Sequence, residues 1–129
     1  METKQVIVLR KDLNMRKGKM VAQGAHASMK VFFDRMTENN GSYVISAKQV
    51  TEAMNEWMQG SFTKVCVSVN SEQELLDIFN KARSVGIPCS LITDAGKTEF
   101  SGVPTKTAVA IGPDEVSKID KITGDLTLL

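Results

Sequence analysis

The stretch Gln5-Val-Ile-Val-Leu-Arg-Lys-Asp-Leu-Asn-Met-Arg-Lys-Gly-Lys-Met-Val-Ala-Gln-Gly-Ala-His-Ala27 decides how the chain folds. An apolar strand over residues 5–9 runs into a basic loop, and the loop opens a helix that we expect over residues 18–35. Apolar residues recur along that helix at close to helical spacing: Met20, Val21, Ala25, Met29, Phe32 and Phe33.

One face of this helix carries polar side chains. Lys19, Gln23 and His26 are spaced i, i+4 and i+7, so they project from the same side. Arg16, Lys17 and Lys19 stand at the helix N-terminus, where cations cost roughly 0.3–1 kcal/mol each and free N–H groups favour an anion. This placement suggests an anionic partner, although flexible side chains that extend into water explain it equally well.

Composition fits one soluble globular domain spanning residues 1–129. The chain is 42% hydrophobic and 24% charged, with a formal net charge of +1. Residues 1–35, however, hold eight Lys and Arg against three acids. A basic patch on a near-neutral protein fits a local phosphate contact better than a wholesale coating of nucleic acid.

Several classes of site and location are disfavoured. Cys66 and Cys89 lie in apolar runs, which predicts small buried hydrophobes. One His and two dispersed Cys cannot form a usual zinc site. The sequence has no apolar stretch of about 20 residues and no signal-peptide pattern, so we expect a cytoplasmic protein without a membrane span.

The remaining patterns predict an α/β fold. Strands are expected over residues 4–10, 63–69, 88–93 and 106–112. Two helices are expected over residues 18–35 and 47–58, the second capped by Ser46. A third follows the capping box at residues 71–74 and ends at Gly86, and a fourth begins at Pro113. Residues 38–42 read as a turn-rich connector, Trp57 as a packing anchor, and 126–129 as an extended tail.

The order of these elements favours a mixed four-stranded sheet with helices on both faces. Helical crossovers make the first three strands parallel, whereas the third and fourth have no helix between them and are expected to be antiparallel. The order of the strands in the sheet stays open.

Ligands bind outside the carboxyl ends of parallel strands in such sheets. The basic loop 11–18 and the loop that begins at Asp94 both leave such ends, which would gather Lys19, Gln23, Asp94 and Thr98. A shielded carboxylate near a Lys could act as a base or an orienting group, and the Lys could stabilise an oxyanion. An ordinary Asx turn at Asp94, with Gly96 at positive φ, is the alternative.

A lone His26 on an amphipathic helix is more often packed than catalytic. No Walker-type, GxGxxG or GxSxG motif is present.

Four motifs, taken together, resemble the type II peptidyl-tRNA hydrolase family, of archaeal and eukaryotic type in a bacterial-like variant. They are Lys-Gly-Lys-Met-Val-Ala-Gln-Gly-Ala-His-Ala (17–27), Thr-Asp-Ala-Gly-Lys-Thr (93–98), Ile-Gly-Pro (111–113) and the ending Ile-Asp-Lys-Ile-Thr-Gly-Asp-Leu-Thr-Leu-Leu (119–129). The resemblance implies a single three-layer α/β/α domain with a mixed four-stranded sheet, a homodimer, and no metal or organic cofactor. It implies hydrolysis of the ester between a peptide and the 3′ ribose of tRNA.

The resemblance also assigns roles to residues. It implies a catalytic group of Lys19, Gln23, Asp94 and Thr98, with His26 matching the motif's His. Water would attack the ester, oriented or deprotonated by Asp94, while Lys19 stabilises the oxyanion. The phosphate contacts we expect in peptidyl-tRNA binding are Lys11, Arg16, Lys17 and Lys97.

Four segments depart from the family pattern. The family commonly has Gly-Gln-Pro where this chain has Gly60-Ser61-Phe62-Thr63, and often has Gln-Ile after the Thr where this chain has Glu99-Phe100. A Pro-Gly turn of the family is replaced by Gly102-Val103-Pro104, and a frequent His is replaced by Asp125. They bear on the contacts to the acceptor end of tRNA, and Glu99 adds a negative charge there. A non-catalytic tRNA- or phosphate-binding module and a dimeric scaffold are the alternative functions.

Overall fold

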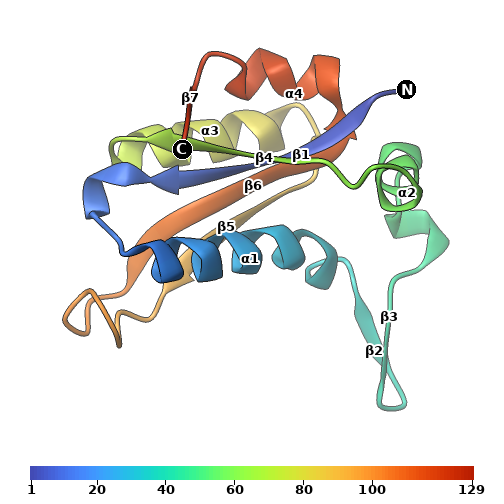
Figure 1. Cartoon of the computed structure of the whole chain (residues 1–129). Coiled ribbons are helices and arrows are strands. Elements are labelled where there is room, and N and C mark those ends of the chain that lie inside the picture. Colours follow the sequence, from blue (N-terminus) through green and yellow to red (C-terminus); the bar gives the residue numbers. More distant parts are fainter.

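The computed structural model describes all residues, 1–129, as three layers with a mixed sheet in the middle (Figure 1). The sheet order is β5-β6-β1-β4-β7, and β2 and β3 form a separate hairpin. The strands are β1 (Thr3–Arg10), β2 (Thr37–Asn39), β3 (Ser42–Val44), β4 (Lys64–Val69), β5 (Cys89–Asp94), β6 (Thr105–Glu115) and β7 (Thr127–Leu128). The helices are α1 (Lys17–Phe33), α2 (Glu52–Gln59), α3 (Glu72–Ser84) and α4 (Val116–Thr123).

The predicted strand directions are confirmed, and the strand order is now known. β1 pairs with β4 in parallel, and β6 lies antiparallel between β1 and β5. Strands β1, β4 and β5 therefore all run the same way. Their carboxyl ends lie along one edge of the sheet, which is the edge from which the loops after Arg10 and Asp94 leave.

The sheet has five strands, so the expected count of four was one short. The extended tail adds β7, which pairs antiparallel with β4 through Val67 opposite Leu128. The N–H of Leu129 also donates to the carbonyl of Cys66 at 3.1 Å. The outer edge of β4 would otherwise expose unpaired backbone groups, and the tail supplies partners for them.

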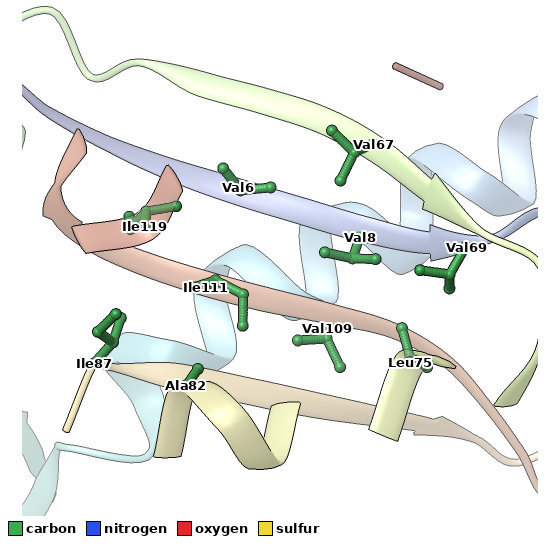
Figure 2. Packing of buried hydrophobic residues seen from close by; sticks show 10 residues of the cluster. All are labelled: Val6, Val8, Val67, Val69, Leu75, Ala82, Ile87, Val109, Ile111 and Ile119. Atoms are coloured by element: carbon green, nitrogen blue, oxygen red, sulfur yellow. The ribbon is translucent and has the colours of Figure 1, made fainter. Parts of the chain in front are cut away.

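Successive side chains of β1 point to opposite faces of the sheet, and this divides the core into two halves. Val6 and Val8 face α3 and α4, where they pack with residues such as Leu75 and Ile111 (Figure 2). Residues of the opposite parity, Ile7 and Leu9, face α1 and α2 and belong to the second cluster. Each such fully buried aliphatic side chain contributes roughly 1.5–3 kcal/mol, so both helical layers are held through the same strand.

Helix α2 starts later than the sequence pattern predicted. Residues Ala47–Gln49 form a 3-10 turn, and the side chain of Thr51, not that of Ser46, accepts the capping hydrogen bond, from the N–H of Met54. Both residues are good N-caps, but Val50 has an extended backbone with φ of −99° and ψ of 112°, so the 3-10 turn cannot continue into α2.

The last helix also starts later than expected. Residues 113–115 continue β6, where Asp114 pairs with Lys4 and Glu115 with Thr3, so α4 begins at Val116. Pairing with β1 outweighs the preference of Pro113 for a first helical turn. The predicted connector 38–42 lies within the β2–β3 hairpin, whose turn has positive φ at Asn40 and Gly41.

Cys66 is exposed, which contradicts the expectation of a buried thiol, whereas Cys89 is partly buried. Cys66 lies opposite Ile7 on a part of the sheet face that α1 does not cover. Its apolar neighbours in sequence therefore did not indicate a covered position. Burial raises the pKa of the Cys89 thiol.

Candidate active site

Lys19, Gln23, Asp94 and Thr98 come together where the start of α1 meets the end of β5. Lys19 Nζ lies 2.9 Å from Asp94 Oδ1 and donates to Thr98 Oγ1 at 2.7 Å. Gln23 Nε2 donates to the same Asp94 oxygen at 3.2 Å. One carboxylate oxygen thus gathers an ammonium and an amide from successive turns of one helix.

The second oxygen of Asp94 makes the Asx turn that the sequence offered as the alternative interpretation of this residue. The N–H of Gly96 donates to Asp94 Oδ2 at 2.9 Å, and Gly96 has φ of +82°. The turn holds the carboxylate with its other oxygen directed at α1. The side chains of Lys19 and Asp94 are only 13% and 15% exposed, so water weakens their interaction less than at an open surface.

The surroundings of Asp94 favour its ionised form. The hydrogen bond from Lys19 lowers the pKa of Asp94 most, burial opposes this, and the Gly96 N–H, the Lys19 charge and Gln23 lower it further. Because a carboxylate with a depressed pKa is a weak base, this environment suits orientation better than proton abstraction.

Thr107 completes the group, and sequence reasoning missed it. Its side chain is fully buried at the start of β6, and its hydroxyl donates to Gln23 Oε1. Gln23 is itself 1% exposed, so this bond fixes which end of its amide faces Asp94. The available signal was a polar residue at the start of an otherwise apolar strand.

His26 does not join the group. It lies one helical turn beyond Gln23 with an exposed side chain, and it makes no hydrogen bond or ion pair. Phe100, by contrast, approaches from the loop after Asp94, with its ring centroid 5.6 Å from Lys19 Nζ. The sequence had marked Phe100 only as a departure from the family pattern.

Unpaired cations surround the group. Lys11, Arg16, Lys17 and Lys97 are exposed and take part in no ion pair. Helix α1 has no acid in its first turn and no side-chain cap, so the N–H groups of its first turn have no intrahelical partner. Glu99 Oε2 accepts from the N–H of Arg16 at 3.4 Å, and Asp94 is already paired with Lys19. The electrostatics of this edge therefore favour an anion.

No three or more His, Cys, Asp or Glu side chains gather as a metal ion would require. None of the helices combines the length and the apolar character needed to cross a membrane.

An apolar groove of about 660 Å³ runs along the opposite flank of α1. We call it the α1 groove. It is lined by Ile7, Leu9, Lys17, Met20, Val21, Gly24, Ala25, Ser28, Met29, Phe62, Lys64, Cys66 and Leu129. Beside it, α1 presents exposed apolar side chains at intervals of one turn, including Val21 at 74% and Met29 at 53% exposure.

Comparison with known proteins gives the site its context. The family model described as peptidyl-tRNA hydrolase PTH2 matches residues 3–129. The chain belongs to the PTH2 family. A peptidyl-tRNA hydrolase of Methanocaldococcus jannaschii is 52% identical over 126 residues, which cover 98% of this chain and 99% of that protein.

More distant relatives carry the same description. The peptidyl-tRNA hydrolase of Methanothermobacter thermautotrophicus is 44% identical over 98% of this chain and 99% of its own length. The one from Saccharolobus islandicus is 41% identical over 98% of both chains. The similarity therefore spans the whole domain, including α1 and the segment around Asp94, which carry the catalytic candidates.

Proposed function

We propose that this PTH2 chain hydrolyses the ester that joins a peptide, or an N-blocked amino acid, to the 3′ ribose of tRNA, and so releases the tRNA for reuse. Family membership supports the reaction. The observation that carries the assignment of the site is the position of Lys19 Nζ, held between Asp94 and Thr98 at 2.9 and 2.7 Å.

Lys19 stabilises the oxyanion in this mechanism. Its ammonium group has three N–H donors. Asp94 and Thr98 accept two of them, which leaves one for the carbonyl oxygen of the ester. A donor fixed before the reaction stabilises charge as it develops without the cost of reorganisation.

Asp94 acts as the orienting group. It accepts hydrogen bonds from Lys19, Gln23 and the Gly96 N–H, and its lowered pKa makes it a poor proton acceptor at neutral pH. The hydroxyl of Thr98 positions the attacking water, and the buried amide of Gln23 holds the Asp94 carboxylate in place. The oxygen of the water bonds to the carbonyl carbon, and the water gives up one proton to the surrounding solvent. The carbon–oxygen bond to the ribose then breaks, and the ribose oxygen takes a proton back from solvent and leaves as a hydroxyl, while the peptide leaves with a free carboxyl group. His26 lies at the rim with no part in these steps.

The tRNA backbone lies along the basic edge. Lys11, Arg16, Lys17 and Lys97 contact its phosphates, because they are the exposed cations without ion-pair partners around the catalytic group. The enzyme works in the cytoplasm, where peptidyl-tRNA arises during translation, and needs no metal or organic cofactor.

The functional unit is a homodimer. A second copy covers the α1 groove, since Val21, Ala25 and Met29 form an i±4 ridge that can enter the corresponding groove of its partner. The same patch on both copies makes a self-complementary twofold contact. Exposed apolar side chains of this size beside a 660 Å³ groove are typical of an interface.

Two variants separate hydrolysis from tRNA binding alone. Lys19→Ala should abolish release of N-acetyl amino acid from N-acetyl-aminoacyl-tRNA while tRNA still binds. Lys17→Ala should weaken binding and reduce its dependence on salt by about one phosphate contact. Full turnover by Lys19→Ala contradicts the catalytic assignment, and no turnover by a folded wild type supports the binding module.

A further inference from the structure

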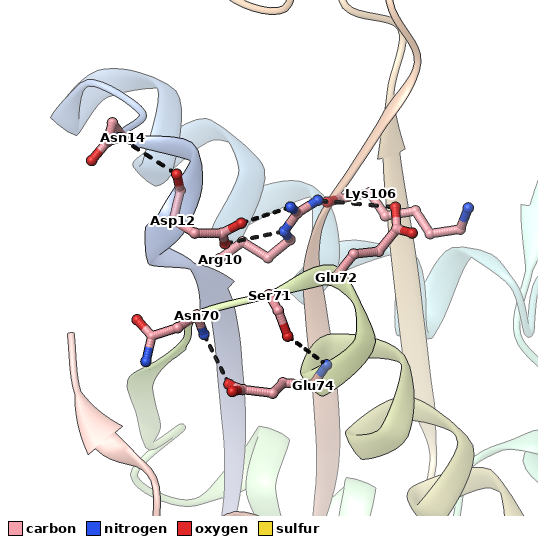
Figure 3. A network of polar contacts seen from close by, with 8 residues as sticks. All are labelled: Arg10, Asp12, Asn14, Asn70, Ser71, Glu72, Glu74 and Lys106. Atoms are coloured by element: carbon pink, nitrogen blue, oxygen red, sulfur yellow. Dashed lines mark hydrogen bonds and ion pairs between the residues drawn. The ribbon is translucent and has the colours of Figure 1, made fainter.

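Arg10 belongs to the basic stretch by sequence, but its side chain faces the protein. It ends β1, and its side chain is 11% exposed. Nε and Nη2 donate to the two carboxylate oxygens of Asp12 at 3.2 and 2.8 Å, while Nη1 donates to the carbonyl of Lys106 at 3.0 Å (Figure 3). Glu72 Oε1 lies 4.0 Å from Nη1. The guanidinium is surrounded by acceptors and has little capacity left for a phosphate.

The two main partners of Arg10 lie in different parts of the site. Asp12 belongs to the 3-10 turn Lys11–Leu13, which begins the basic loop. The carbonyl of Asp12 accepts from Asn14 Nδ2, and Asn14 closes that turn with a φ of 53°. Holding the Asp12 carboxylate therefore holds the turn from which the loop continues toward Arg16 and Lys17.

The other partner leads to the catalytic group. Lys106 directly precedes Thr107, whose hydroxyl holds Gln23. One planar side chain thus joins the start of the basic loop to the start of β6. The two parallel bonds to Asp12 need the fork of a guanidinium, which a lysine ammonium does not provide.

We propose that Arg10 is a positioning residue that sets the basic loop 11–18 against the catalytic group, and that it is not a phosphate contact. The inference rests on the proposed binding of tRNA by this loop. The lowered pKa of Asp12, caused mainly by its hydrogen bond from Arg10, agrees with a carboxylate held in this bridge.

Asp12→Ala tests the proposal, because a phosphate contact and a positioning role for Arg10 predict opposite changes in tRNA affinity. If Arg10 contacted phosphate, Asp12→Ala would free it, remove a negative charge from the loop and tighten tRNA binding. A positioning role predicts the reverse: the dissociation constant for deacylated tRNA and the KM for N-acetyl-aminoacyl-tRNA rise about 3- to 10-fold. The kcat at saturating substrate stays within about twofold, because loop placement governs binding.

Arg10→Lys supplies the second variant, because it keeps the charge and loses the fork. We expect it to weaken binding as much as Asp12→Ala, and the double variant to be little worse than either single one. Asp34→Ala is the matched control, since it removes an exposed acid paired with Lys30 at the far end of α1. It should leave binding unchanged, and circular dichroism should show all variants folded.

Two results overturn the inference. Tighter binding by Asp12→Ala makes Arg10 a direct phosphate contact, and wild-type binding by Arg10→Lys shows that the guanidinium fork is not needed; in both cases the proposed function stands. Absence of tRNA binding by the wild type removes the proposed function itself, and this inference with it.

Discussion

Lys19 and Asp94 lie 75 residues apart in the chain, and their Nζ and Oδ1 atoms are 2.9 Å apart in the structure. The fold creates this pair by placing the start of α1 beside the end of β5. The same ion pair lowers the pKa of Asp94 and holds the Lys19 ammonium beside the Asp94 carboxylate. The catalytic hypothesis depends on this relationship.

Thr107→Val tests whether the hydrogen bond from Thr107 to Gln23 supports the Lys19–Asp94 pair. Valine has nearly the shape of threonine but cannot donate to Gln23 Oε1, so a buried acceptor loses its partner. We expect a loss of about 1–3 kcal/mol in the free energy of unfolding and a fall in kcat of about tenfold or more. Urea unfolding and steady-state kinetics measure the two effects.

Thr123→Val is the control for Thr107→Val. Thr123 is also buried, but its hydroxyl bonds the Ile119 carbonyl within α4, far from the site. Its kcat should match that of the wild type. Equal kcat in both variants would show that Thr107 has no part in placing Gln23.

Gly96→Ala tests the turn at Asp94. A Cβ at this position would lie 2.3 Å from the carbonyl oxygen of Val103, and φ is +82°. We expect the loop 95–104 to shift, at a cost of about 1–3 kcal/mol, and kcat to fall. Gly102→Ala has a similar φ of +79° but no atom within 4 Å, so it should cost less and keep more activity. Equal losses would mean that backbone strain alone matters.

Stability should depend on pH through Asp94. Because its folded pKa is depressed, its contribution is fully present above the ordinary value of about 3.9 and is lost as pH falls through the lower folded value. The difference in unfolding free energy between the wild type and Asp94→Asn should stay constant above about pH 5 and shrink below pH 4. A difference that grows on acidification would contradict the assigned direction.

The α1 groove predicts an effect on assembly. Val21→Asp places a charge on the exposed ridge of α1, so we expect a monomer where the wild type is a dimer, as measured by light scattering. Val85→Asp changes a residue of similar exposure, 64% against 74%, beyond the end of α3 and should leave the dimer intact. A Val21→Asp variant that stays dimeric would place the interface elsewhere.

Sequence reasoning could bring together most of the candidate catalytic group because one rule covers it. Lys19 and Gln23 follow β1 in the chain and Asp94 ends β5, and because these strands run parallel their carboxyl ends share an edge. Thr107 fell outside this rule, since β6 runs antiparallel and brings its first residues, not its last, to that edge. A polar residue early in an antiparallel strand was the missing criterion.

Local signals failed where pairing or packing decided the outcome. Pro113 favoured a helix start, yet pairing of the following residues with β1 extends β6 to Glu115. Cys66 looked buried because its neighbours are apolar, yet α1 covers only part of the sheet face. A short stretch of sequence encodes neither the order of the strands in the sheet nor how much of the sheet face a helix covers.

The most direct test of the catalytic hypothesis is release of N-acetyl amino acid from N-acetyl-aminoacyl-tRNA, in the presence of EDTA, by the wild type and Asp94→Ala. Removing the carboxylate frees Lys19 and Gln23 from their shared partner, so we predict cleavage by the wild type and a fall in kcat of at least about 100-fold in the variant. Circular dichroism and tRNA binding should be retained. Equal cleavage by the two proteins would contradict a hydrolase that works through Lys19 and Asp94.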